Sequence, residues 1–365
     1  ARLPREQIRA AFDELLAAFA EAGLPYRREG DGQRNCVLPT SVGTVKRSYC
    51  LPAAMWGGAV ALQARTPTLL VDFYGIADYS ARQIAAGLQE RWPGLRTVRL
   101  SFPGAAGRGD LSREHLARQL DLPACRAELT RAIRPELAGA EACGLPALLG
   151  LVRHGEVVAE LQQRLGVPVF EIPTPPISVP GLRLQAAFVR LLAAAGVRTL
   201  PRQRVLRAGQ DGEGRFLLEI GQEATVERTV LARGVILASG RFFGRGLAAD
   251  RHGIRETLFD LPVHQPERRQ WYRSDLLDPQ SHAIHQAGLA VDAELRPLDA
   301  SGRPARAGLH AAGSILAHQD WTRSKSGAGL AIATAHAAVA AFAGSMAGPA
   351  GPAGPAGPAG RSEVR

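Results

Sequence analysis

The stretch Leu309-His310-Ala311-Ala312-Gly313-Ser314, followed after a polar loop by Ser326-Gly327-Ala328-Gly329, decides the fold of this chain. The first stretch predicts a short strand, and the second opens an alanine-rich helix over residues 330–342. A glycine at a strand end lets the backbone approach a ligand closely. A Ser/Gly helix start directs free N–H groups and a partial positive charge forward, so an anion or a polarised carbonyl fits there. A plain strand-loop-helix unit without a ligand is the alternative interpretation.

A second strand of the same kind precedes it in the chain. Residues 234–240, Gly-Val-Ile-Leu-Ala-Ser-Gly, are almost wholly apolar and end in glycine. Such a strand is buried on both faces and delivers its carboxyl end to a ligand crevice. Before it, residues 182–195 predict an amphipathic helix, and residues 215–220 and 225–231 alternate as antiparallel strands.

The first half of the chain predicts a separate α/β domain. Strands at residues 68–74 and 97–102 flank a helix at residues 78–91, in β-α-β order. A second unit has strands at 147–152 and 167–172 around a helix at 157–165. Residues 173–181 are rich in proline, which withholds donors and fixes φ, so we place a domain crossing there. The expected domains are a helix of the ligand-binding domain at 1–30, an inserted α/β domain at 31–178, the rest of the ligand-binding domain at 179–343, and a flexible Gly-Pro-Ala tail at 344–365.

Composition argues against a nucleic-acid partner. The net charge is +10, but Lys46 and Lys325 are the only lysines, and the arginines are scattered along the chain without a block of five like charges. Aromatic residues make up only 5% of the 365 residues, so surfaces for base stacking have little support. The glycine-rich residues 104–109 follow a proline and precede no immediate helix, so we expect a plain loop rather than a phosphate cradle.

Cysteine and histidine spacing predicts no metal site. The four cysteines, Cys36, Cys50, Cys125 and Cys143, form no C-x-x-C pair, which indicates a reducing cytoplasm. His282 and His285 stand one helical turn apart without a nearby carboxylate or cysteine, so two surface histidines are expected. The chain shows no charged leader and no run of 18 strongly apolar residues. We therefore expect residues 327–343 to form a buried helix.

Three stretches together resemble the flavin-binding half of glutathione-reductase-type flavoproteins: the helix at 182–195, the strand ending at Ser239-Gly240, and the 309–329 motif. A closer resemblance is to the B subunit of anaerobic glycerol-3-phosphate dehydrogenase, over nearly residues 10–342. It rests on residues 38–44, 174–184, 238–247, 252–256 and 313–316, of which the Phe242-Phe243 and Gly253-Ile254-Arg255-Glu256 stretches are specific. Gly313-Ser314 stands where many flavoproteins carry Gly-Asp, which removes a charge.

The resemblance implies an α/β fold with a flavoprotein-type, Rossmann-like dinucleotide-binding domain and an inserted α/β second domain. The usual glycine-rich βαβ turn is not found in this sequence, and we expect it to belong upstream. FMN is the implied cofactor, with FAD as the alternative. The implied cofactor-binding residues are Ser239, Gly240, Gly313, Ser314, Ser326, Gly327, Ala328 and Gly329.

The resemblance also implies a reaction and partners. The reaction is oxidation of sn-glycerol 3-phosphate to dihydroxyacetone phosphate, with electrons passed to quinone. The partners are a catalytic flavoprotein subunit and an iron–sulfur membrane-anchor subunit, which would hold the cytoplasmic chain at the inner face of the membrane. Two alternatives stay open: an electron-relay or assembly subunit of the same complex, and a generic FAD-dependent oxidoreductase of another substrate.

Candidate catalytic residues follow from their placement. His318 and Asp320 lie in the loop between Ser314 and Gly327, where a proton acceptor would meet the substrate. Arg255, with Arg241 and Arg245, follows the apolar strand and suits a phosphate group. A structural role is the alternative for each arginine, because the chain is rich in this residue.

Overall fold

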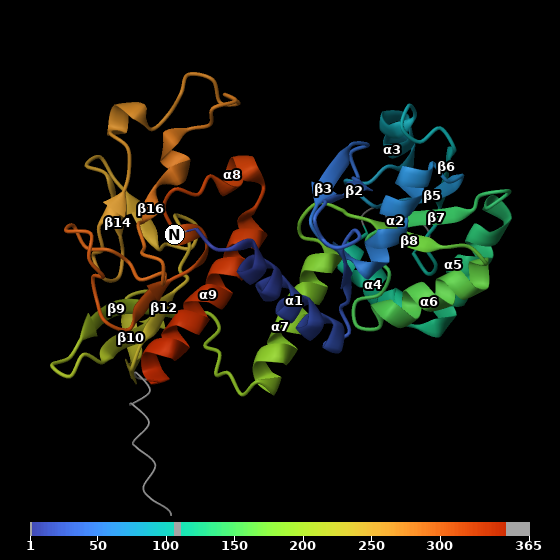
Figure 1. Ribbon diagram of the computed structural model, residues 1–365. Helices are drawn as coiled ribbons and strands as arrows, with labels where there is room; N and C mark the ends of the chain where they lie inside the picture. The colour runs from blue at the N-terminus through green and yellow to red at the C-terminus, as the bar shows by residue number, and fades with distance from the viewer. Residues whose placement is uncertain (1, 106–110, 348–365) are drawn as a thin grey trace, which may run out of the picture. The chain divides into compact units, whose positions relative to one another are not determined.

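The structure is a computed structural model that describes residues 2–105 and 111–347. Most of the Gly-Pro-Ala tail predicted at 344–365 and most of the glycine-rich loop at 104–109 lie outside these residues; residues 344–347 were expected in the tail but end a helix, Gly327–Ala347. The chain forms two compact units (Figure 1). Unit 1 joins the chain start up to Leu15 with the part from Leu200 onward, and unit 2 comprises Leu16–Thr199. The domain boundaries expected at residues 30/31 and 178/179 stay predictions.

Unit 2 is built on a four-stranded parallel sheet in the order β6-β5-β7-β8. Its strands are β5 (Thr68–Phe73), β6 (Leu95–Leu100), β7 (Ala142–Pro146) and β8 (Val169–Ile172). Leu70 of β5 pairs with Thr97 of β6 and with Gly144 of β7. β5, β7 and β8 are buried along their whole length, as expected for strands covered on both faces.

One predicted strand of unit 2 was misplaced. Residues 147–152 were expected to be a strand, but β7 ends at Pro146, and Ala147, Leu148 and Leu149 form a fully buried loop at its carboxyl end. The loop stays buried because the Glu171 carboxylate accepts the Leu149 N–H at 2.8 Å. The apolar sequence of residues 147–149 therefore correctly indicated that they are buried, but it did not indicate whether they form a strand.

Helices and hairpins complete unit 2. The helices are α1 (Arg5–Glu21, shared with unit 1), α2 (Ala53–Ala64), α3 (Ala81–Leu88), α4 (Arg113–Leu120), α5 (Pro123–Ile133), the 3-10 turn η1 (Arg134–Glu136), α6 (His154–Leu165) and α7 (Val179–Ala194). The antiparallel pairs are β1 (Tyr26–Arg27) with β4 (Leu51–Pro52), and β2 (Cys36–Pro39) with β3 (Val45–Ser48). Ser80 caps α3 by accepting the Gln83 N–H, which sets its start three residues later than predicted.

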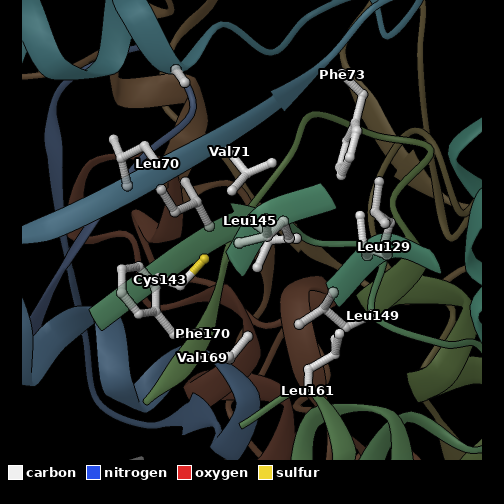
Figure 2. Close-up of a cluster of buried hydrophobic side chains, with 14 of the residues drawn as sticks. Leu70, Val71, Phe73, Leu129, Cys143, Leu145, Leu149, Leu161, Val169 and Phe170 are labelled. Atoms are coloured by element: carbon white, nitrogen blue, oxygen red, sulfur yellow. The ribbon is translucent and has the colours of Figure 1, made fainter. Parts of the chain in front are cut away.

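The core of unit 2 lies around its sheet. Figure 2 shows Leu70 and Phe73 of β5, Cys143 and Leu145 of β7, and Phe170 of β8 among side chains from α5 and α6. Gly144 has no room for a side chain, because a Cβ there would lie 2.8 Å from both Leu70 and Phe170. The sheet and the helices are therefore close-packed at this point.

Unit 1 contains the two strands that the sequence placed beside a ligand. β12 (Val235–Leu237) and β17 (Leu309–Ala311) pair in parallel. A three-stranded antiparallel sheet precedes them, in the order β11-β10-β9; the sequence predicted the antiparallel pair at 215–220 and 225–231, and β9 joins it as a third strand. Its strands are β9 (Arg204–Gln210), β10 (Phe216–Gln222) and β11 (Thr225–Ala232). The remaining elements are β13 (Leu247–Ala249), β14 (Ile254–Glu256), β15 (Val263–His264), η2 (Arg268–Gln270), η3 (Ala283–Gln286), β16 (Gly288–Leu289), η4 (Gly313–Ile315), α8 (Trp321–Ser324) and α9 (Gly327–Ala347).

The alanine-rich helix α9 is buried on one side only. Ala333, Thr334, Ala337 and Ala338 are buried, whereas Val339 is 54% exposed. By length and composition alone, Gly327–Met346 is the one helix among the described residues that could cross a membrane, and this is weak evidence because core helices pass the same test. The expectation of a buried helix is thus correct for one face of α9.

Candidate functional site

The carboxyl ends of β12 and β17 lie side by side in unit 1. Leu237 is the register partner of Ala311, and the Ala312 N–H donates to the Leu237 carbonyl at 3.1 Å. The chain then continues as Ser239-Gly240 from one strand and as Gly313-Ser314 from the other. These four residues, which the sequence assigned to the cofactor from two distant stretches, are therefore brought together.

Both glycines have the backbone conformation that favours glycine. Gly240 has φ +70° and Gly313 has φ +77°. A Cβ built at Gly313 meets no atom within 4 Å, and one built at Gly240 meets only Ser314 Oγ at 3.5 Å and Gly244 Cα at 3.9 Å. The space at the Cβ position of Gly313 is therefore open to a ligand that approaches the backbone, whereas the Cβ position of Gly240 is in van der Waals contact with Ser314 and Gly244.

A buried hydroxyl next to these glycines lacks a partner. Ser239 Oγ is buried without a hydrogen bond to any described residue. The turn that follows folds tightly onto it, since a Cβ at Gly246 would lie 2.3 Å from Ser239 Oγ. An unsatisfied buried hydroxyl costs about 1–3 kcal/mol, so its presence favours a ligand that supplies the missing partner. The open position at Gly313 and the unpartnered Ser239 hydroxyl fit the polar ribityl or pyrophosphate part of a flavin.

The start of α9 lies about two helical turns from the point where this helix contacts Gly313. The Gly313 N–H donates to Thr334 Oγ1 at 2.8 Å, and Thr334 Oγ1 donates to the Leu330 carbonyl at 2.6 Å. Gly327 precedes Thr334 by seven residues, which corresponds to about 10 Å along a helix. Ser326, Gly327, Ala328 and Gly329 are therefore separated from Gly313 by about two turns. The first N–H groups of a helix have no acceptor inside it, so this end can bind an anionic part of an extended ligand.

Arg241 holds the loop after β17 in place. Its guanidinium donates to the backbone carbonyls of Ser314 at 2.6 Å, Leu316 at 3.2 Å, Gln319 at 3.0 Å and His285. Burial lowers the pKa of Arg241, and the nearby Asp320 carboxylate opposes this effect. With its donors engaged by the backbone, Arg241 takes the structural role and not that of a phosphate clamp.

His318 is an exposed imidazole in that loop. Its φ is +62°, and its N–H donates to the Gln286 carbonyl at 2.9 Å. The ring lies against His264, with 4.1 Å between the ring centroids. Partial burial lowers the pKa of His318, and the charge of His264 lowers it further. A neutral imidazole is thereby favoured, which suits a proton acceptor.

Asp320 is tied into the local structure. Its carboxylate accepts the Arg323 N–H at 3.0 Å at the start of α8 and lies 3.7 Å from His285 Nδ1. Burial raises the pKa of Asp320, but hydrogen bonds from Ser281 and Arg323 and the charge of His285 outweigh it and leave the pKa below its usual value. Asp320 is therefore an ionised helix cap, already engaged in hydrogen bonds.

Arg255 lies on β14 and lines a surface pocket together with Arg204 and Arg245. Neither His318 nor Asp320 lines that pocket. Sequence reasoning missed His264 and Arg204, because only tertiary pairing brings them beside the predicted residues. Within the described ranges, no group of three or more His, Cys, Asp and Glu side chains is arranged to hold a metal ion.

Most of the chain is similar to known proteins. The family described as an FAD binding domain matches residues 5–330. A Halobacterium salinarum protein, named as the probable B subunit of anaerobic glycerol-3-phosphate dehydrogenase, is 33% identical over 335 residues, covering 88% of this chain and 77% of that protein. Proteins named as the B subunit of anaerobic glycerol-3-phosphate dehydrogenase are 30% identical in Pectobacterium atrosepticum, covering 84% and 72%, and 28% identical in Vibrio cholerae, covering 87% and 74%.

Proposed function

Because this chain belongs to the FAD binding domain family, and within it to the B-subunit family of anaerobic glycerol-3-phosphate dehydrogenase, we propose that it binds FAD at the strand ends of unit 1 and takes part in oxidising sn-glycerol 3-phosphate to dihydroxyacetone phosphate. FAD takes the place of the FMN expected from the sequence, since the family description names FAD and nothing supports FMN. The chain is a subunit of a flavin-dependent oxidoreductase.

One observation supports the site above all. Two adjoining strands lead into Gly240 and Gly313, of which Gly313 is open at the Cβ position, beside the unpartnered hydroxyl of Ser239. In this proposal, Ser239 and Ser314 hydrogen-bond the cofactor while the glycine backbones approach it. The start of α9, with Ser326, Gly327, Ala328 and Gly329, directs its free N–H groups toward a negatively charged part of the same molecule.

When bound, FAD supplies the acceptor for the hydride that leaves C2 of the substrate. His318 takes the hydroxyl proton, because its lowered pKa keeps the imidazole neutral and its side chain is exposed on the loop after β17. Asp320 and Arg241 position that loop through the contacts described above. Electrons then pass to a partner flavoprotein, an iron–sulfur membrane subunit and quinone, with the chain in the cytoplasm at the membrane's inner face.

Two glycine variants test the cofactor site. Gly313 and Gly302 both have positive φ, +77° and +79°, and a Cβ at either position meets no atom within 4 Å. Gly313→Ala and Gly302→Ala therefore impose similar backbone strain, but only the first adds a methyl group at the proposed site. We expect Gly313→Ala to weaken FAD binding about tenfold or more, measured by flavin fluorescence titration, and Gly302→Ala to leave it unchanged. Equal affinities for the two variants would contradict the site.

A second measurement separates a catalytic subunit from an electron-relay or assembly subunit. Adding glycerol 3-phosphate anaerobically to the isolated, FAD-loaded chain should bleach the flavin absorbance if this chain oxidises the substrate. Bleaching that occurs only in the assembled complex would assign the oxidation to the partner.

A further inference from the structure

A pocket on unit 1 is lined by three arginines and no carboxylate. Its volume is about 550 Å³, and it lies over the β13–β14 hairpin and the turn that leads into it. Its arginines are Arg204, Arg245 and Arg255. The remaining lining residues are Phe242, Leu247, Ala248, Ala249 and Thr257.

These three arginines differ from others of the same unit. All three are exposed, and no described carboxylate lies within ion-pair distance of them. By contrast, Arg207 pairs with Glu219, and Arg215 pairs with Asp211 at 2.8 Å. The lining arginines therefore keep their donors available.

The two carboxylates nearest along the hairpin are already engaged. Glu256 is buried and accepts the N–H groups of Leu258 and Phe259 at 2.9 and 2.7 Å. Asp250 accepts the N–H groups of His252 and Gly253, and these hydrogen bonds contribute more to its lowered pKa than the charge of Arg255 does. Three like charges thus line one pocket whose lining holds no carboxylate, although the Asp250 carboxylate outside the lining interacts with the charge of Arg255. This excess of positive charge attracts an anion.

The backbone around the pocket is held in a defined conformation. Arg245 has φ +61°, in the left-handed region that favours glycine. Its N–H donates to the Phe242 carbonyl at 3.1 Å, and its carbonyl accepts from Thr257 Oγ1 at 2.7 Å. Both Phe242 and Thr257 line the same pocket. The backbone of Arg245 is therefore held at the pocket by its neighbours before any ligand binds, while its side chain is exposed.

The pocket adjoins the strand end proposed for the cofactor. The turn from Gly240 to Gly246 connects them, and a Cβ at Gly246 would lie 2.2 Å from the Gly240 carbonyl oxygen. Two kinds of ligand could place a phosphoryl group in this pocket. One is a small phosphate ester, and the other is the pyrophosphate of a dinucleotide.

We propose that Arg204, Arg245 and Arg255 form a binding site for a phosphoryl group. Several guanidinium groups can donate charge-assisted hydrogen bonds to its oxygens at once. The site rests on the pocket's own residues, and only the identity of the phosphate ester rests on the proposed function.

The test compares two triple variants by calorimetric titration with inorganic phosphate, glycerol 3-phosphate and FAD. One replaces Arg204, Arg245 and Arg255 with Gln. The control replaces Arg9, Arg47 and Arg233 with Gln, which are exposed, line no described pocket and change the net charge equally. The pocket variant should weaken phosphate binding about tenfold or more, and the control should change it less than about twofold.

The ligands whose binding is weakened in the pocket variant show which molecule carries the phosphoryl group. Weakened binding of glycerol 3-phosphate with unchanged FAD binding supports the ester, and weakened FAD binding supports the pyrophosphate. Equal effects of the pocket and control variants on all three ligands would overturn the proposal. This failure is distinguishable from failure of the FAD site, which the Gly313→Ala and Gly302→Ala pair tests separately.

Discussion

Replacing Arg183 with Met should strongly destabilise unit 2. Arg183 on α7 forms a bidentate ion pair with Glu171 on β8, with Nη1–Oε2 and Nη2–Oε1 distances of 2.8 Å. The Nε of Arg183 also donates to the Gly150 carbonyl at 2.8 Å. The Arg183 and Glu171 side chains are only 3% and 0% exposed. Removing the guanidinium leaves a buried carboxylate whose remaining donor is the Leu149 N–H. Breaking a buried pair in this way costs about 3–5 kcal/mol.

An exposed pair of the same chemistry provides the control. Arg118 and Glu114 lie one helical turn apart on α4, 2.8 Å from each other and 57% and 46% exposed. Arg118→Met should therefore lower the free energy of unfolding by only about 0.3–0.5 kcal/mol. Both variants remove a guanidinium from a glutamate partner, so the contrast compares a buried pair, with its added bond to Gly150, with an exposed one.

Amide hydrogen exchange measures the effect within unit 2. Because about 1.4 kcal/mol corresponds to a tenfold change, a loss of about 3–5 kcal/mol in Arg183→Met should speed exchange of the protected β7 and β8 amides roughly 10²- to 4 × 10³-fold. Adding Glu171→Gln should recover about half of the loss, because the buried charge is removed while the amide oxygen still accepts the Leu149 N–H. Equal exchange in the Arg183→Met and Arg118→Met proteins would refute the reasoning.

Three further predictions concern titratable groups. Burial, and then the charge of Arg183, lower the pKa of His154 in the folded protein, so the unfolded chain binds more protons below its ordinary pKa of about 6.5. Stability should therefore fall as the pH drops below that value, and His154→Gln should flatten this part of a pH series of urea unfolding curves; an unchanged slope would contradict it. His318→Asn should lower kcat of the assembled enzyme about 10²-fold or more if His318 is the proton acceptor, and an unchanged rate removes it from that role. Burial raises the pKa of Cys143 to about 12, so a thiol reagent at pH 8 should modify half-buried Cys50 first, and equal labelling of Cys143 in the folded protein, read by mass spectrometry, would be the opposing result.

Local chemistry made part of the site predictable. Gly240 and Gly313 stand at the ends of apolar segments, and such positions are readable from one sequence because only glycine adopts the left-handed backbone freely. The family resemblance is confirmed, and so is the flavin, although the preference for FMN over FAD is not supported. The catalytic roles of His318, Asp320 and Arg255 stay predictions.

Other features depend on contacts between distant segments. Arg241 looked like a candidate phosphate ligand, but its donors are directed at carbonyls up to 78 residues away in the chain. Residues 147–149 looked like a strand because burial and strand formation leave the same apolar pattern. Neither outcome could be derived from neighbours in the sequence.

The sequence by itself determined the α/β class, the apolar segments that lead into Gly240 and Gly313, and the family, because hydrophobic periodicity and glycine placement act over a few residues. Only the tertiary structure decided that Ser239 and Ser314 lie at adjoining strand ends, that His318 packs against His264, and that Arg204 joins Arg245 and Arg255 around one pocket. These arrangements follow from strand pairing and side-chain packing across long separations, which a linear pattern does not encode.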